Sequence, residues 1–451
     1  MENKIYIDYI TQGLKKYADF SPIRFHMPGH KGNFSHQILN DSLKFDVTEL
    51  SVTDDLYAPI DIIEKSERQA TEFYGTKNTV FSPFGATSCI FTMLYIYKML
   101  NGKKLLVDRC SHKSVFNALG VLDIECEYIY PDLISEFSIS DTVSLKNIKT
   151  VFNEDIGGIL ITSPNYYGIT SDIESISKFC KKNNIILMID NSHGSHFFFN
   201  DKKKFHPLSF NVDFCVDSIH KTLPVATGGA LLHCNLNIDK RVIKKAMGLF
   251  YSSSPSYLIM SSIDSGLCYM FNNGKKIFDE YKNIIFNFKN DIKKAGYSIY
   301  ENMFFDDYKV LISLKNKDIS GYSLLKLMNE KNIYPEMCDD ENILLMISPF
   351  NKKSDLNNFI GFLKSLSLNE KNYIEKKENL YVNRKKVLSL NKCIFSQKEL
   401  LKIENSKNRI CSDMIYDYPP GIPIILPGEI IDDNVIEILN KKSYNEITVI
   451  K

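Results

Sequence analysis

The sequence predicts an α/β protein whose large domain is built on a mostly parallel sheet, followed by an α+β C-terminal domain. Between about residues 46 and 270, short apolar runs rich in β-branched residues alternate with helical patterns. Runs such as IGGILIT and IILMID have the length of strands and are almost continuously apolar. This composition is typical of parallel strands that are covered by helices on both faces.

The expected elements follow one another in order. Helical spacing of apolar residues predicts helices at about 59–74, 87–100, 113–121 and 171–182. Between and after them, strands are predicted for NTVFS, KLLVD, CEYIY, GGILIT, IILMID and VDFCVD. Beyond residue 273 the pattern changes to helices with a few strands, including KVLISL and NILLMIS. The charge-dense stretch 369–386 is predicted to be a solvated helix face.

Three regions are expected on this basis. Residues 1–45 form an N-terminal arm with one amphipathic helix, at about 5–18, and a segment rich in Pro, Gly and His. Residues 46–272 form the large domain that binds the ligand, and residues 273–451 form the C-terminal α+β domain.

Composition excludes several kinds of partner. The formal net charge of +1 gives no electrostatic reason to expect nucleic acid or an anionic membrane. The apolar runs are too short to cross a bilayer, and the N-terminus lacks the apolar core of a signal peptide. Ten cysteines without a C-x-x-C pair indicate reduced thiols. We therefore expect a cytoplasmic protein.

Polar residues cluster where the predicted strands end, and ligands bind at the carboxyl ends of parallel strands. Lys221 follows the strand VDFCVD and is flanked by Ser218 and His220, which could donate to a phosphate. A lysine amine in a fixed position can form a Schiff base with a carbonyl, including that of pyridoxal phosphate. An ordinary surface lysine is the alternative.

Asp190 ends the strand IILMID, where a carboxylate is costly unless it is paired. A protonated pyridine nitrogen is a suitable partner, and the ionised acid would keep the ring able to accept electrons. Capping of the next turn is the alternative role. His193 and His196 could instead suggest a metal, but no acidic or cysteine partner has clear ligand spacing, so no metal is expected.

Two further strand ends carry candidate groups. Thr87 and Ser88 open a helix after NTVFS, and hydroxyls with free N–H groups at a helix N-terminus can bind an anion. His112 follows KLLVD and could stack on a flat ring. A lysine, an acid for a ring nitrogen, a phosphate site and a stacking ring together match pyridoxal phosphate, which we predict as the cofactor.

The same motifs make the chain resemble the bacterial ornithine/lysine/arginine decarboxylases, pyridoxal-phosphate enzymes of the aspartate-aminotransferase fold (fold type I). The resemblance runs through nearly the whole chain and follows the short form of the family. It is carried by HMPGHKG (26–32), DVTEL (46–50), DDL (54–56), GATS (85–88), RCSHKS (109–114), SPNYYG (163–168), DNSHGSH (190–196), SIHKTLPVATGG (218–229), SSSPSY (252–257) and YPPGIPIILPGE (418–429).

The resemblance implies a role for each candidate residue. Lys221 would hold the cofactor, Asp190 would pair its ring nitrogen, and His112 would stack on the ring; these three are the expected catalytic residues. The expected cofactor-binding residues also include Thr87, Ser88, Ser192, His193, Ser218 and His220. The implied reaction is decarboxylation of arginine, lysine or ornithine for polyamine metabolism, in a homodimer or higher oligomer with shared sites.

The substrate's distal cation would require a carboxylate. Four acids in family-like motifs are candidates: Glu49, Asp54, Asp55 and Glu429.

The sequence departs from the family at two places. Asp190-Asn191-Ser192-His193 stands where the family usually reads D-E-A-H or D-x-A-W, and Gly228 follows Thr227 where a Gln is common. Neither change removes a chemically required group.

Other readings stay open at this point. They are an aminotransferase or aldolase reaction on the same fold, a non-catalytic protein that binds basic amino acids or polyamines, and a metal hydrolase.

Overall fold

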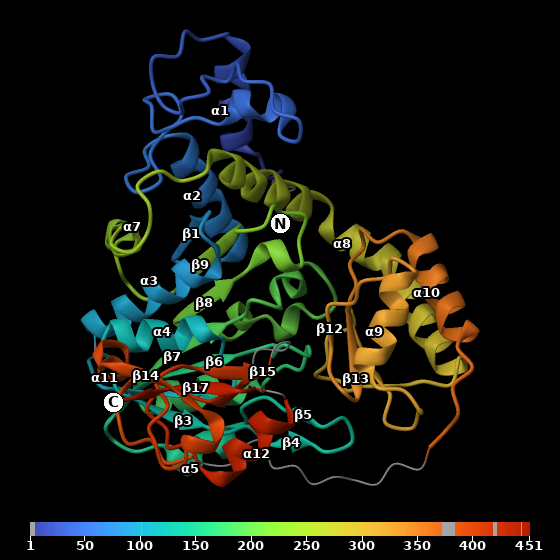
Figure 1. Cartoon of the computed structure of the whole chain (residues 1–451). Helices are drawn as coiled ribbons and strands as arrows, with labels where there is room; N and C mark the ends of the chain where they lie inside the picture. The colour runs from blue at the N-terminus through green and yellow to red at the C-terminus, as the bar shows by residue number, and fades with distance from the viewer. Residues whose placement is uncertain (1–4, 101, 372–383, 418–421, 443) are drawn as a thin grey trace. The chain divides into compact units, whose positions relative to one another are not determined.

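A computed structural model describes the chain except for residues 1–4, 101, 372–383, 418–421 and 443 (Figure 1). Most of the charge-dense stretch predicted as a helix, and the first four residues of the motif at 418–429, lie outside the described residues. In the described part, no helix is long and apolar enough to cross a membrane.

The chain divides into two compact units, each made of two segments. Unit 1 comprises residues 1–100 and 173–280, and unit 2 comprises residues 101–172 and 281–451. Helix α8, Tyr257–Lys294, contains the last boundary, between residues 280 and 281. The expected division after residues 45 and 272 stays a prediction.

Four strands of unit 1 lie in the order β1-β9-β8-β7, and Figure 1 shows the first three side by side. Strands β7 and β8 are parallel, whereas β9 is antiparallel to both β8 and β1. Since β1 and β8 both oppose β9, strands β1, β8 and β7 all run in one direction. Their bounds are β1 Asn78–Ser82, β7 Ile186–Asp190, β8 Phe214–Asp217 and β9 Ala230–Cys234.

Register separates the side chains of these strands into two faces. Asp190 pairs with Val216, and Ser82 pairs with Ala230, so these residues belong to what we call the near face. Helix α3 packs on the near face, where Ser88 contacts Ser82. Helix α2 packs on the opposite, far face, where the Tyr74 ring lies 4.6 Å from that of His233.

The helices of unit 1 each bury an apolar face, and α3 is apolar over most of its length. They are α1 Tyr9–Asp19, α2 Ile62–Tyr74, α3 Gly85–Leu100, α6 Ile173–Lys182 and α7 Lys240–Gly248. The N-terminus of α1 is capped from a distance, because Asp264 Oδ2 on α8 accepts from the backbone N–H of Ile10 at 2.8 Å. Short 3₁₀ helices lie at Asn40–Phe45, Ser195–Phe199, Lys203–Phe205, Pro207–Phe210 and Ile219–Lys221.

Unit 2 holds the three parallel strands β6-β2-β3 and a separate four-stranded antiparallel sheet in the order β10-β11-β13-β12. The first set is β2 Lys104–Asp108, β3 Cys126–Ile129 and β6 Ile156–Thr162, with helices α4 Lys113–Val121 and α5 Leu145–Val151. The second set is β10 Ser298–Ile299, β11 Lys309–Ser313, β12 Met337–Cys338 and β13 Asn342–Met346, with helices α9 Gly321–Glu330 and α10 Lys353–Ser365.

Smaller elements complete unit 2. The end of the chain has its own apolar core around Ile425, Ile431 and Val449. The remaining elements are α11 Leu390–Phe395, α12 Asp433–Lys441, a 3₁₀ helix Ile403–Asn405, and the strands β4 Leu133–Ile134, β5 Ile139–Ser140, β14 Lys398–Lys402, β15 Ile415–Asp417, β16 Ile422–Ile425 and β17 Glu446–Ile450.

A buried ion pair joins three elements of unit 1. Glu67 of α2 accepts from the Lys244 ammonium of α7 and from the backbone N–H of Phe81 in β1, and the two charged side chains are 0% and 1% exposed. Burial lowers the pKa of Lys244, which the charge of Glu67 partly restores. Such a pair is strongly destabilising when only one partner is lost.

We therefore predict that Glu67→Ala lowers the free energy of unfolding by about 3–5 kcal/mol, because it leaves Lys244 buried without its carboxylate. The paired change Glu67→Leu with Lys244→Met should lose much less. Urea denaturation followed by circular dichroism measures both. A single variant as stable as the paired one would contradict the prediction.

Candidate active site

The carboxyl ends of β1, β8 and β7 meet at one edge of the unit 1 sheet, because these strands run in the same direction. Thr87 follows β1, Lys221 follows β8, and Asp190 ends β7. A backbone bond ties two of the following turns together, since the Gly85 N–H donates to the Gly228 carbonyl at 2.7 Å. The structure therefore brings the unit 1 candidates to a common edge, as the sequence predicts.

The carboxylate of Asp190 is buried, with 2% of the residue exposed, and only one of its oxygens is occupied. Asp190 Oδ1 accepts from the Ser192 backbone N–H at 3.1 Å and from the Ser192 hydroxyl at 2.5 Å. Among the described residues, none donates to Oδ2. The hydroxyl of Ser192 thus orients the acid and leaves one oxygen available to a ligand.

The Lys221 ammonium donates to the ring nitrogen Nε2 of His193 at 3.1 Å. His193 is buried, whereas Lys221 is exposed at the end of the 3₁₀ turn Ile219–Lys221. The contact connects the turns after β8 and β7, and the role of Lys221 stays a prediction.

The start of helix α3 offers donors of two different kinds. Gly85 has φ of +77°, a conformation that favours glycine, and begins the helix directly after the turn. The hydroxyl of Thr87 is on an exposed residue. The buried hydroxyl of Ser88 donates to the Gly85 carbonyl at 2.8 Å and contacts Ser82, so only its backbone N–H remains for an anion.

Ser218 and His220 lie beside each other in the lysine turn. His220 Nδ1 is 3.0 Å from the Gly229 carbonyl and 3.4 Å from the Ser218 hydroxyl. Burial lowers the pKa of His220, and the charge of Lys221 lowers it further. We expect a neutral ring whose Nδ1–H donates to the carbonyl.

His112 belongs to unit 2, where it follows β2 and caps helix α4. Its Nδ1 accepts from the backbone N–H of Ser114 at 3.3 Å. Stacking of this ring on a cofactor stays a prediction.

Three of the four acids considered for the substrate's distal cation have structural partners. Asp54 accepts from backbone N–H groups of residues 55, 60, 61 and 63. Glu429, which is 0% exposed, pairs with Arg109 in unit 2 at 2.9 Å. Asp55 accepts from the backbone N–H of Tyr57. Glu49 accepts from the Thr48 hydroxyl at its Oε2, while its Oε1, like that of Glu429, is buried and receives no hydrogen bond from any described residue. Unlike Glu429, Glu49 forms no ion pair with a described residue.

The two histidines that could suggest a metal lie in different surroundings. His193 contacts Lys221, whereas the buried His196 ring packs 4.7 Å from that of Phe197. Among the described residues, no three His, Cys, Asp or Glu side chains are arranged to hold a metal ion.

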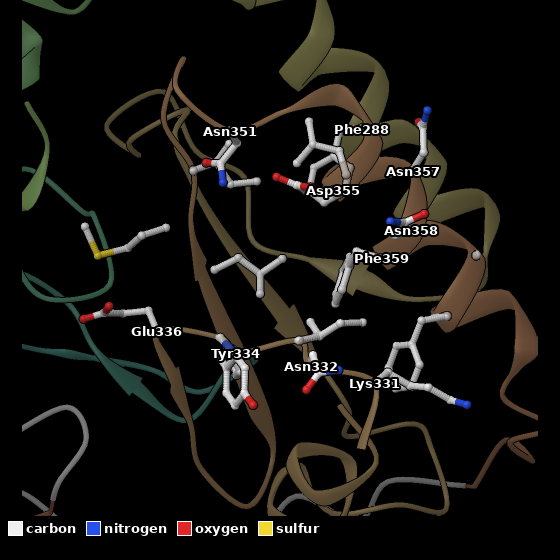
Figure 2. Close-up of a pocket in the computed structure, with 18 of the residues that line it drawn as sticks. Phe288, Lys331, Asn332, Tyr334, Glu336, Asn351, Asp355, Asn357, Asn358 and Phe359 are labelled. Carbon is white, nitrogen blue, oxygen red and sulfur yellow. The ribbon is translucent and has the colours of Figure 1, made fainter. Parts of the chain in front are cut away.

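A separate cavity of about 790 Å³ lies within unit 2 and contains none of the predicted site residues. Figure 2 shows Asp355 and Phe359 from helix α10 on one side and Asn332 and Tyr334 on the other. Its lining mixes amide, aromatic and aliphatic side chains with the charged residues Lys331, Glu336 and Asp355.

Sequence reasoning missed two contacts of the site. It treated Ser192 as a replacement for an apolar contact, whereas the structure makes it the donor to Asp190. It also did not consider Asp217, although a carboxylate at the end of a buried strand requires a partner for the same reason as Asp190.

Comparisons with known proteins place the chain in a family. The family model described as "Orn/Lys/Arg decarboxylase, major domain" matches residues 9–302, and that of the "Orn/Lys/Arg decarboxylase, C-terminal domain" matches residues 371–443. The chain is 26% identical to the arginine decarboxylase of Bacillus subtilis (strain 168), over 95% of this chain and 92% of that protein. It is 27% identical to the arginine decarboxylase of Bacillus anthracis, over 95% and 91%.

The fold is also that of a solved enzyme. The crystal structure of the Francisella novicida lysine decarboxylase superposes with a TM-score of 0.84 at 16% identity, covering 99% of this chain and 81% of that one. This likeness confirms the predicted α/β fold class. Because the major-domain match extends over more than half of the sequence, the chain belongs to the Orn/Lys/Arg decarboxylase family of enzymes.

Proposed function

We propose that this enzyme decarboxylates a basic amino acid with pyridoxal phosphate held on Lys221. The observation that carries the proposal is the carboxylate of Asp190 at the same sheet edge as Lys221. One of its oxygens accepts hydrogen bonds from Ser192, and the other is available to a ligand. A buried acid with one oxygen fixed and the other available suits a cationic ring nitrogen, which would offset the cost of burying the charge.

The other residues also fit this cofactor. Thr87 and the first N–H groups of α3 provide donors and a helix dipole for a phosphate. Ser218 and His220 lie in the turn that carries Lys221. Ser192 and His193 would lie against the ring, and His112 would stack on it. When bound, the cofactor supplies an electron sink for the pair left on the substrate carbon.

The residues of the chain have separate tasks in this scheme. Asp190 keeps a positive charge on the ring nitrogen, and Ser192 holds the acid in its orientation. Lys221 would hold the cofactor, and His193 would position the lysine amine from 3.1 Å. After carbon dioxide leaves, a proton adds to the same substrate carbon, so that hydrogen replaces the carboxylate.

Two observations support the proposed substrate class: the activities of the relatives and one acidic residue of the chain. Arginine and lysine decarboxylases among the relatives favour a substrate with a distal cation. We propose Glu49 first as its partner, since its buried Oε1 lacks a hydrogen bond and, unlike Glu429, it forms no ion pair with a described residue. The amine product would supply polyamine metabolism in the cytoplasm.

We also propose a homodimer or higher homo-oligomer. Large apolar side chains of the N-terminal region stand exposed, which is unusual unless a surface is covered by a partner. They are Phe20, Ile23, Phe25, Met27, Phe34, Ile38, Val52 and Ile60, each more than half exposed.

Lys221 should be the residue that carries the cofactor. Borohydride reduction of the yellow holoenzyme should fix the cofactor to the peptide containing Lys221, as read by mass spectrometry. Lys221→Ala should remain folded and lose the label. Labelling of a different lysine in the native protein would show that the assignment is wrong.

Asp190→Asn should keep the fold but weaken the electron sink, because the ring nitrogen loses its ionised partner. We expect the turnover rate to fall on the order of a hundredfold or more. The measurement is amine production with cofactor occupancy checked by absorbance. A variant with full occupancy and a rate within about threefold of the native enzyme would contradict the role.

The holoenzyme should release labelled carbon dioxide from carboxyl-labelled arginine, lysine or ornithine. Equal-length neutral analogues should react roughly tenfold to a hundredfold less efficiently, since a charge-assisted hydrogen bond is lost. Glu49→Gln should reduce the preference for the cation while leaving the neutral analogue unaffected. Absence of release from all three amino acids, with cofactor on Lys221, would reject the decarboxylase proposal and favour transamination or aldol cleavage.

A further inference from the structure

A second buried carboxylate, Asp217, ends strand β8 on the far face of the sheet. Val216 is the register partner of Asp190, so Asp217 is the next residue along β8 and points to the opposite face. Its side chain is 0% exposed. The two acids therefore end neighbouring parallel strands and lie on opposite faces of the same sheet edge.

Three side chains surround the Asp217 carboxylate, and each is itself 0% exposed. Its Oδ2 lies 3.2 Å from Nε2 of His206 and 3.2 Å from Nε2 of His233. Its Oδ1 accepts from the amide Nδ2 of Asn191 at 2.5 Å. Because Asn191 directly follows Asp190, this last bond connects the far-face acid to the turn that carries the near-face acid.

The hydrogen bonds assign both imidazoles as neutral donors. His206 Nδ1 accepts from the backbone N–H of Leu208 at 3.4 Å, so the ring proton is on Nε2, facing Asp217. His233 Nδ1 lies 2.9 Å from the hydroxyl of Thr79, which can donate to it. Burial lowers the pKa of His233, which also favours the neutral ring.

Asp217 itself is ionised in this arrangement. Burial alone would raise its pKa, but the interaction with His206 and the hydrogen bond of His233 hold the pKa well below the usual range. The other titratable groups near it are Tyr74 and Cys215, and burial raises the pKa of both, so they are neutral. Across the described residues, no Lys or Arg forms an ion pair with Asp217 or Asp190.

Two carboxylates thus end adjacent strands with no described cation to balance them. Their negative potentials add at the near face, where the free oxygen of Asp190 lies. A group that carries positive charge at that place is stabilised by both acids, although it contacts only one.

We propose that Asp217 is a positioning residue that acts from behind the sheet: its charge strengthens binding of a protonated ring nitrogen at Asp190, and Asn191 transmits its position to the Asp190 turn. The inference rests on the proposed cofactor. It goes further by giving a function to a buried cluster, Asp217-His206-His233-Asn191, that does not touch the ligand.

The experiment compares two ligands on apo-protein by fluorescence titration. One is pyridoxal phosphate, and the other is its analogue with carbon in place of the ring nitrogen, which cannot carry the charge. Asp217→Asn should weaken binding of pyridoxal phosphate roughly tenfold, the scale of a charge–charge interaction in a protein interior, and that of the analogue less than about twofold. A purely structural role would weaken both equally, and that result, or no weakening of either, would overturn the proposal.

Asp264→Asn is the matched control. Asp264 is another buried carboxylate of unit 1, but it accepts from backbone N–H groups of α1 and is not part of the cluster. It should change neither dissociation constant. If Asp264→Asn weakened binding of pyridoxal phosphate relative to the analogue as much as Asp217→Asn does, that result would also overturn the proposal.

A second variant covers the case in which Asp217→Asn does not fold. In Asp190→Asn the far-face charge remains, so pyridoxal phosphate should still bind at least about twofold more tightly than the analogue. Equal affinities would reject the role of Asp217. Failure of the native protein to bind pyridoxal phosphate at Lys221 would instead reject the proposed function, which keeps the two outcomes distinct.

Discussion

The direction of strand β9 is the constraint on which the candidate site depends. Because β9 is antiparallel to both β1 and β8, these two strands are parallel to each other although they do not pair. Strand β7 then continues the same direction beside β8. Three turns far apart in sequence therefore emerge from one edge, and their residues can serve one ligand. Reversal of any of these strands would carry its polar residues to the other end of the sheet.

The buried carboxylates of unit 1 differ in the partners that satisfy them. Asp54 accepts from backbone N–H groups, Glu67 from the Lys244 ammonium and a backbone N–H, and Asp217 from neutral side-chain donors. Glu67 Oε2 and Asp264 Oδ1 also receive no hydrogen bond from any described residue, so an oxygen without a donor is not special to Asp190. Asp190 differs because its hydrogen bonds come from one neighbour, Ser192, and because it ends the strand beside the one that leads to Lys221. Since an unpaired buried charge is expensive, an acid in this place suits a cationic ligand.

Much of this fold could be predicted from sequence because its strands are short, apolar and regularly separated by helices. The strand ends and the order of Thr87, Asp190 and Lys221 along them followed from that pattern. The roles of Asn191 and His206 could not be predicted, because they depend on which faces neighbouring strands present to each other, and register is not visible in a single strand.

The two departures from the family pattern acquire physical reasons in the structure. Ser192 adds a hydroxyl where a small apolar residue is usual, and that hydroxyl bonds Asp190 Oδ1. Gly228 adopts φ of +102°, a conformation that disfavours other residues, and its carbonyl accepts from Gly85 at the start of helix α3. One change fixes the acid at the ring end of the proposed ligand, and the other joins the lysine turn to the phosphate end. Ser192 and Gly228 therefore both affect contacts that arrange the residues around Lys221. The departures alter these contacts and leave in place the groups proposed to bind the cofactor.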